Sequence, residues 1–183
     1  MTRFGKEKRR NSLDSESLRE LALAYVGRFA TSRAKLIRYL GRKIVERGWG
    51  EEREPDIEAL VTRFAQLGYV DDDAYARMKG ASMERRGLGA RRIGASLRAD
   101  GIGETERHGA EEQARRGSWD AADIFARRRR IGPYAQQRQA DPRIREKQLA
   151  AFLRAGHSMD VARLWVDAPP GEFPPQEGAE KGE

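Results

Sequence analysis

The sequence predicts an all-α protein made of three tandem three-helix repeats, which form an elongated, curved and basic array between disordered tails. Three observations favour this fold class. A short motif that begins helices recurs at intervals of roughly 50 residues. Glycines followed by an apolar residue stand where helices should end. No segment shows the alternating pattern of a half-buried strand.

The recurring motif consists of an apolar residue, an Asp, three further residues and a second apolar residue. The Asp carboxylate can accept hydrogen bonds from the free N–H groups of a helical first turn, while the flanking apolar residues pack on each other. The motif therefore assigns structural N-caps to Asp14, Asp71 and Asp120.

The glycine pattern is typical of a Schellman ending, in which the glycine is left-handed and the next side chain packs back on the helix. It predicts structural C-caps at Gly48, Gly68 and Gly101, and a weaker one at Gly156. The expected apolar pairs are Trp49 with Ile44, Tyr69 with Phe64, and Ile102 with Leu97.

These signals divide the chain into five parts. A basic, disordered N-terminal tail (1–12) precedes the first repeat (13–68), the second (69–117) and the third (118–166). The final segment, 167–183, is rich in Pro and Glu and is expected to be disordered.

Apolar residues with helical spacing support each repeat. In the first repeat, Thr31–Ser32 can cap the second helix, and Pro55 suits the first turn of the third. In the third repeat, Asp141–Pro142 and Ser158 begin two helices. The segment 104–115 is poorly apolar and is the weakest helix prediction.

Composition argues against several classes of site. There is no cysteine, which excludes disulfides, thiol catalysis and thiolate metal sites, and there are only two histidines, far apart in sequence. The run Asp71-Asp72-Asp73 could bind a divalent metal, but acidic residues in a first turn also interact favourably with the helix dipole. With no Gly-rich phosphate loop either, we expect no catalytic residue, metal or cofactor.

The sequence predicts a cytoplasmic protein. The basic N-terminus is not followed by an apolar stretch of signal-peptide length, and no segment approaches the ~20 apolar residues of a membrane span.

The charge pattern indicates where a partner binds. The net charge is +7, and basic residues concentrate between 77 and 98 and again between 127 and 130. Two such clusters in successive repeats can line one groove for nucleic acid or an acidic protein filament, although a basic stretch is often only a solvated face. The candidate partner-binding or DNA-binding residues are Arg77, Arg85, Arg86, Arg91, Arg92, Arg98, Arg127, Arg128, Arg129 and Arg130. A helix-turn-helix around 82–99 is a weaker alternative, because no helix there carries the Asn or Gln suited to base edges.

Several segments also resemble a known family. The stretches Gly68–Ala76, Arg85–Ile93 and Leu97–Ile102 are similar to the centre of RecX, the regulatory protein of the RecA recombinase. Upstream, Leu21–Phe29 and Ser32–Leu36 resemble the first repeat of its proteobacterial members, as does the pair Arg42-Lys43. The resemblance is clear from about residue 17 to 103 and looser from there to about 166.

The resemblance implies curved, basic three-helix repeats that lie in the groove of a RecA filament on single-stranded DNA. It further implies inhibition of RecA ATPase and strand exchange, hence roles in recombination, DNA repair and the SOS response. The expected partners are the RecA filament and its single-stranded DNA, bound by a monomer without catalytic residues. The weak helix at 104–115 departs from the family pattern. The alternative is a general single-stranded DNA- or RNA-binding helical protein that acts without RecA.

Overall fold

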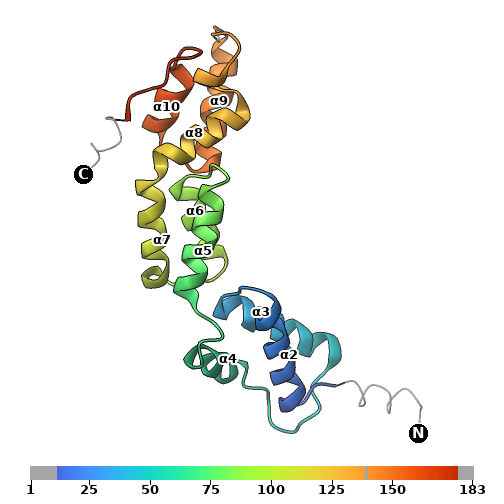
Figure 1. Ribbon diagram of the computed structural model, residues 1–183. Helices are drawn as coiled ribbons and strands as arrows, with labels where there is room; N and C mark the ends of the chain where they lie inside the picture. Colours follow the sequence, from blue (N-terminus) through green and yellow to red (C-terminus); the bar gives the residue numbers. More distant parts are fainter. Residues whose placement is uncertain (1–11, 139, 177–183) are drawn as a thin grey trace. The chain divides into compact units, whose positions relative to one another are not determined.

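The computed structural model describes residues 12–138 and 140–176, and within them the chain is helical, which confirms the all-α prediction (Figure 1). An isolated bridge between Leu13 and Trp49 is the one β-type pairing in these ranges. None of the described helices has the length and apolar character that crossing a bilayer requires. The helices are α2 (Ser15–Arg28), α3 (Arg33–Arg47), α4 (Ile57–Gln66), α5 (Asp72–Glu84), α6 (Ala90–Ala99), α7 (Glu104–Arg116), α8 (Ser118–Arg129), α9 (Pro142–Ala155) and α10 (Met159–Asp167), with a 3-10 turn, η1 (Gly132–Tyr134), before α9.

The chain divides into two compact units. The first unit consists of the chain up to Tyr75 together with the short segment Asp100–Ile102. The second consists of Ala76–Ala99 and the chain from Gly103 onward. Most of the second predicted repeat and the whole of the third thus share one unit. The division into three repeats and the curved shape stay predictions.

The first unit is built on the apolar faces of α2, α3 and α4. Its core consists of Leu13, Leu18, Ala22, Leu36, Leu40, Val61, Phe64 and Val70. The chain before α2 is tied to the end of α3, because the Leu13 N–H donates to the Gly48 carbonyl at 2.8 Å and the Gly50 N–H to the Leu13 carbonyl at 2.8 Å.

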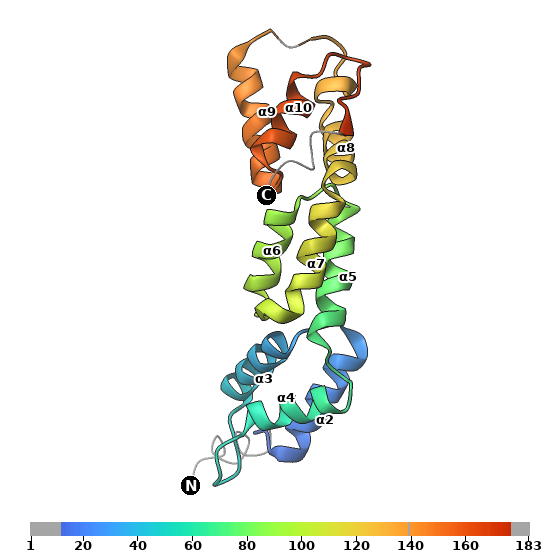
Figure 2. The same ribbon diagram turned by 90° about the vertical axis from the view of Figure 1, so that its left-hand side faces the viewer.

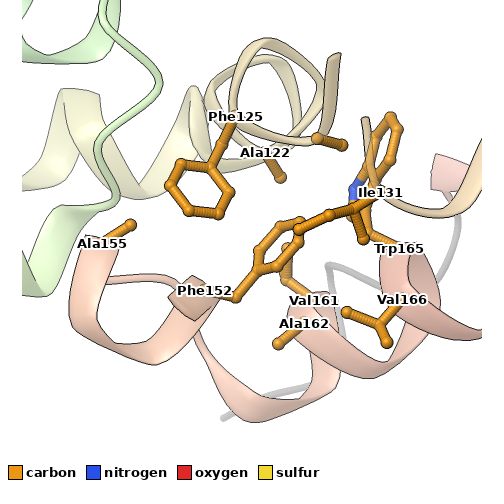
Figure 3. Close-up of a cluster of buried hydrophobic side chains, with 10 residues drawn as sticks. Ala122, Phe125, Ile131, Phe152, Ala155, Val161, Ala162, Trp165 and Val166 are labelled. Carbon is orange, nitrogen blue, oxygen red and sulfur yellow. The ribbon is translucent and has the colours of Figure 1, made fainter. Parts of the chain in front are cut away.

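The second unit has its largest core between α8, α9 and α10 (Figure 3). Phe125 on α8 points toward Phe152 on α9, with ring centroids 4.8 Å apart and planes at 68°. Trp165 on α10 is 1% exposed. Full burial of side chains of this size contributes about 1.5–3 kcal/mol each, so this cluster anchors the C-terminal helices.

Small residues pack the other end of the second unit, where α5, α6 and α7 meet. A Cβ at Gly80 of α5 would lie 3.4 Å from the Ala110 Cβ of α7 and 3.7 Å from the Ile93 Cγ2 of α6. Ala110 and Ala114, one turn apart on α7, are buried. Close packing of small side chains explains how the poorly apolar segment 104–115 forms a helix with few large apolar residues.

The Asp caps behave differently at the three predicted helix starts. The Asp14 carboxylate accepts from the Ser17 N–H at 2.8 Å and completes a capping box. The Asp71 Oδ1 accepts from the Ala74 N–H at 2.9 Å. The cap assigned to Asp120 is wrong: α8 begins at Ser118, directly after α7 and Gly117, so Asp120 lies inside the first turn. There its charge still faces the positive end of the helix dipole.

The same kind of shift occurs before α4. Asp56, not Pro55, adjoins this helix as its N-cap, and its Oδ1 accepts from the Ala59 N–H at 2.9 Å. Pro55 therefore precedes the cap and lies outside the first turn.

Two of the predicted glycine endings are complete Schellman motifs. At Gly68, the glycine N–H donates to Ala65 and the Tyr69 N–H to Phe64, and the Tyr69 and Phe64 rings are 5.4 Å apart. Gly156, the weaker prediction, has the same pair of bonds, Gly156 N–H to Leu153 and His157 N–H to Phe152.

Gly48 ends its helix in a different way, and Gly101 has the left-handed φ that a glycine stop requires. Gly48 has a φ of +83° but an extended ψ of 162°, so it leads the chain into the bridge with Leu13 instead of closing a Schellman turn. Gly101 has a φ of +80°.

The start of α6 and the end of α9 meet backbone to backbone, an arrangement we call the glycine junction (Gly89–Arg92 with Ala155–Gly156). The Gly89 N–H donates to the Ala155 carbonyl at 2.9 Å, and the Arg91 N–H to the Gly156 carbonyl at 3.2 Å. A Cβ at Gly89 would lie 2.5 Å from the Gly156 carbonyl carbon. Only glycine permits this approach.

The first unit contains a related contact at the start of α3. The Ser32 Oγ donates to the Asp100 carbonyl at 2.8 Å, and a Cβ at Gly101 would lie 2.3 Å from the Ala34 Cβ. Here too the first turn of a helix packs on a glycine turn from further along the chain.

The described part of the C-terminal segment corrects the expectation of disorder from residue 167. Asp167 forms a two-bond ion pair with Arg145, both bonds 2.6 Å. The Gly171 N–H donates to the Pro133 carbonyl at 2.9 Å, and the Phe173 ring lies 5.5 Å from that of Tyr134. These contacts hold Asp167, Gly171 and Phe173 in place despite the Pro- and Glu-rich composition of the segment. The basic tail 1–11 and residues 177–183 lie outside the described residues.

His157 is buried beside the glycine junction. Its ring is 2% exposed and lies between Phe125 and Phe152, with centroids 5.5 and 5.3 Å away. Nε2 is 3.1 Å from the Gly87 carbonyl, and Nδ1 is buried without a hydrogen-bond partner among the described residues. Burial lowers the pKa of His157, so the ring is neutral with its proton on Nε2.

We expect Gly89→Ala to destabilise the protein by about 1–3 kcal/mol, because the added methyl group must displace backbone at the glycine junction. Gly27→Ala in α2 is the matched control. A Cβ there meets nothing within 4 Å, so this change should stabilise the helix by about 0.5–1 kcal/mol. Urea unfolding of the two variants measures both effects. Equal stabilities for the two variants would contradict the proposed close contact.

We also expect stability to fall as the pH is lowered through about 6.5. The unfolded chain then binds a proton at His157 that the folded chain excludes, so the contribution is complete above the unfolded pKa and is lost below it. The added slope is at most about 1.4 kcal/mol per pH unit for one proton. Urea unfolding from pH 7.5 to 5 should show a weaker pH dependence for His157→Gln than for the wild type, while the exposed His108→Gln should follow the wild type.

Candidate partner-binding surface

The ten arginines predicted from sequence are all exposed and all belong to the second unit. They come from α5, from the turn between α5 and α6, from α6 and from the end of α8. The structure brings some of them together in two places. Arg91 and Arg98 form a groove group. Arg85, Arg86 and Arg128 form a turn group, and the other arginines belong to neither.

A groove of about 860 Å³ opens in the second unit along α6 and α7, which lie side by side in both views (Figure 2). The start of α10 and the end of α9 complete its wall. The lining residues are Gly89, Ala90, Arg91, Gly94, Arg98, Glu111, Arg115, Ser118, Gly156, His157, Ser158, Asp160 and Val161.

Three of the lining residues are cations: Arg91 and Arg98, two turns apart on α6, and Arg115 on α7. They outnumber the acidic lining residues, Glu111 and Asp160. The first turn of α6 carries no acidic residue that would offset the arginines. The groove is thus suited to an anionic group.

The carboxylate of Glu111 holds the wall of the groove. Its Oε1 lies 3.4 Å from Nη1 of Arg98 and 3.1 Å from Nε of Arg107. Arg107 is the less exposed of the two arginines and lies one turn from Glu111 on α7. Arg98, at 55% side-chain exposure, can therefore turn toward a ligand while Glu111 keeps a partner.

The second group lies at the turn between α5 and α6. Nη1 of Arg128 donates to the Arg86 carbonyl at 3.0 Å, which brings α8 to the turn that also presents Arg85. This contact joins the two basic stretches of the sequence at one point.

Arg127 and Arg129, the neighbours of Arg128 in the basic run, contact aromatic residues instead. Nη2 of Arg127 donates to the Tyr134 hydroxyl at 3.3 Å and lies over its ring, and that hydroxyl donates to Asp123 at 2.5 Å. Burial, followed by the Asp123 hydrogen bond, raises the pKa of Tyr134, and the bond from Arg127 to Tyr134 raises the pKa of Arg127. Arg129 lies over the Phe125 ring at 5.7 Å.

The other three predicted arginines are exposed but do not line the groove. Arg130 ends α8 in the left-handed conformation, with a φ of 54°. Arg77 on α5 and Arg92 on α6 do not line the groove.

Sequence reasoning missed Arg115, Ser118 and Asp160. Arg115 lies in the segment whose helix was the least certain, although its spacing of one turn from Glu111 is visible in the sequence. Ser118 and Asp160 reach the groove only through the packing of α8 and α10, which no local pattern encodes.

In the acidic run that follows Val70, Asp71 and Asp72 have structural roles. Asp71 caps α5, and Asp72 accepts from the Arg33 N–H at 2.8 Å within the first unit. The described residues contain no group of three or more potential metal ligands placed to hold an ion.

Comparison with known proteins gives a consistent result. No family model matches the chain. The regulatory protein RecX of Myxococcus xanthus is 32% identical over 170 residues, which cover 89% of this chain and 91% of that protein. The regulatory protein RecX of Agrobacterium fabrum is 32% identical over 104 residues, or 57% of this chain and 55% of that protein.

Solved structures show the same fold. A crystal structure of regulatory protein RecX aligns with a TM-score of 0.60 at 20% identity, over 81% of this chain and 70% of that one. The crystal structure of RecX from Lactobacillus salivarius aligns with a TM-score of 0.60 at 17% identity, over 80% of this chain and 90% of that one. Together with the identity to the Myxococcus protein along nearly the full length, these matches show that the chain belongs to the RecX family of regulatory proteins.

Proposed function

We propose that this protein binds the RecA nucleoprotein filament and regulates RecA, mainly by inhibiting its ATPase and strand exchange. It would thereby act on recombination and the SOS response. Membership of the RecX family supports RecA as the partner. The groove with Arg91, Arg98 and Arg115 is the observation that carries the binding site, because it combines cations with an open, built cavity.

The mode of action we propose is binding without catalysis, by a cytoplasmic monomer. The groove group and the turn group belong to one unit, and the glycine junction fixes α6 against α9. A filament offers the same surface on every subunit. A rigid unit with two separate cationic groups is suited to contact two successive subunits, or one subunit and the single-stranded DNA within the filament, and so to restrain both.

The alternative is a general single-stranded DNA- or RNA-binding protein that acts without RecA. The net charge of +7 favours it, since any chain with this charge attracts polyanions at low salt. Stoichiometry separates the two functions. A competitor for DNA must cover nucleotides in proportion to its amount, whereas a filament regulator can act at a few sites.

We expect inhibition of RecA ATPase on single-stranded DNA at physiological salt when this protein is present at well below one copy per ten RecA subunits. The measurement is a titration of ATP hydrolysis with the full chain. Inhibition only after the DNA is saturated would instead favour the polyanion binder and would reject regulation through the filament.

The double variant Arg91→Gln/Arg98→Gln should raise the concentration for half-inhibition by about 5-fold or more, because a few central side chains, often arginines, carry most of the binding energy of an interface. It should also fold normally, since Glu111 keeps Arg107. The control, Arg143→Gln/Arg154→Gln, removes two exposed charges from α9 in the same unit and should leave inhibition unchanged. Equal loss in both pairs would mean that net charge, not the groove, determines binding.

A further inference from the structure

The first unit carries a second, separate surface that combines aromatic rings with cations. We call it the aromatic surface and define it by Tyr25, Arg28 and Phe29 from the end of α2, and Tyr39, Arg42 and Lys43 from α3. None of these residues belongs to the arginines considered above. The two helices pack on each other within the first unit.

The rings form a continuous row. Tyr25 and Tyr39 are stacked, with centroids 4.1 Å apart and planes at 20°, and Tyr25 lies 5.3 Å from Phe29. Phe29 is 52% exposed at the end of this row. Its position is fixed by the backbone, because its N–H donates to the Tyr25 carbonyl at 3.0 Å as the cap of α2. The row therefore ends in an exposed ring on a backbone position held by the end of α2.

Cations flank the rings at both ends. The Arg28 guanidinium lies 5.6 Å from the Phe29 centroid, and Arg42 and Lys43 lie 5.8 and 5.9 Å from that of Tyr39. Glu46 pairs with Lys43 at 2.6 Å and with Arg42 at 3.6 Å, so one carboxylate serves two cations.

The surrounding sequence is strongly basic. Between residues 25 and 47 Glu46 is the single acidic residue, and the basic residues are Arg28, Arg33, Lys35, Arg38, Arg42, Lys43 and Arg47. Arg33 and Lys35 pair with Asp72 and Asp100, but the other positive charges exceed the acidic ones. The local charge therefore favours an anionic occupant.

We propose that the aromatic surface binds single-stranded nucleic acid, with a base stacked on Phe29 and phosphates held by Arg28 and Arg42. An acidic protein would use the cations but gains little from exposed ring faces. Base faces stack on aromatic rings, whereas a duplex hides its base faces from such contact. An exposed ring with cations on either side of the row can contact both the bases and the phosphates of one strand.

This inference deepens the proposed function, since it assigns contact with the single strand to the first unit and leaves the groove for RecA. The test uses DNA without RecA, so the two proposals can fail independently. The full chain is titrated against fluorescein-labelled oligo(dT) and against an abasic oligonucleotide of the same length, which keeps the phosphates but lacks the bases.

The wild type should bind oligo(dT) more tightly than the abasic strand. Phe29→Leu keeps an apolar side chain but removes the ring, and should weaken oligo(dT) binding by about 5-fold or more while leaving abasic binding unchanged. Arg28→Gln/Arg42→Gln should weaken both equally and reduce the salt dependence by about 0.7 per arginine. Leu23→Ala, at a side chain of α2 that is 49% exposed and not aromatic, is the control and should change neither.

A further variant keeps the test decisive if Phe29→Leu fails to fold. Phe29→Trp preserves stacking, and its added indole emission should be quenched by oligo(dT) but not by the abasic strand. Equal wild-type affinity for the two strands, or unaltered oligo(dT) binding by folded Phe29→Leu, would overturn the inference. Neither result bears on inhibition of RecA ATPase, which tests the proposed function separately.

Discussion

The arrangement of the second unit depends on the close approach of two glycine backbones. At the glycine junction, Gly89 and Gly156 leave no room for side chains, and the N–H groups that begin α6 donate to carbonyls that end α9. A helix start has free donors and a helix end has free acceptors, so each end satisfies the other. His157 follows directly, and its Nε2 lies 3.1 Å from the Gly87 carbonyl, which adds a side-chain contact to the junction. The groove along α6 exists because this junction places the start of α10 beside it.

The two units use positive charge in different physical settings. In the second unit, three arginines line a cavity, and Glu111, the carboxylate partner of Arg98, lies in the same wall. In the first unit, cations lie beside rings and share one carboxylate, Glu46. Guanidinium groups over aromatic faces are held in place yet keep donors available for phosphate. The same excess of arginine therefore produces two surfaces with different chemistry.

Local sequence patterns predicted the helices well because caps and stops act over one turn. Asp14, Asp71, Gly68 and Gly156 each satisfy backbone groups within five residues of themselves. The prediction failed at Asp120, where α7 and α8 are separated by Gly117 alone and the start of α8 is set by the preceding helix. The ordered residues after 166 depend on Pro133 and Tyr134, and a composition rule does not register such distant contacts. Likewise, sequence located the arginines but not their grouping, since Arg115 joins Arg91 only through the packing of α6 on α7.

The glycine junction also bears on how such a chain can change in length during evolution. In many helical arrays each repeat contacts only its neighbours, through interfaces of similar side chains that recur along the array. Here the donors of one predicted repeat and the acceptors of the next are main-chain atoms. Deleting α8–α10 would leave the Gly89 and Arg91 N–H groups without their acceptors, and duplicating α5–α7 would require a second glycine at each new contact. Gain or loss of either predicted repeat would therefore require this main-chain contact to be rebuilt.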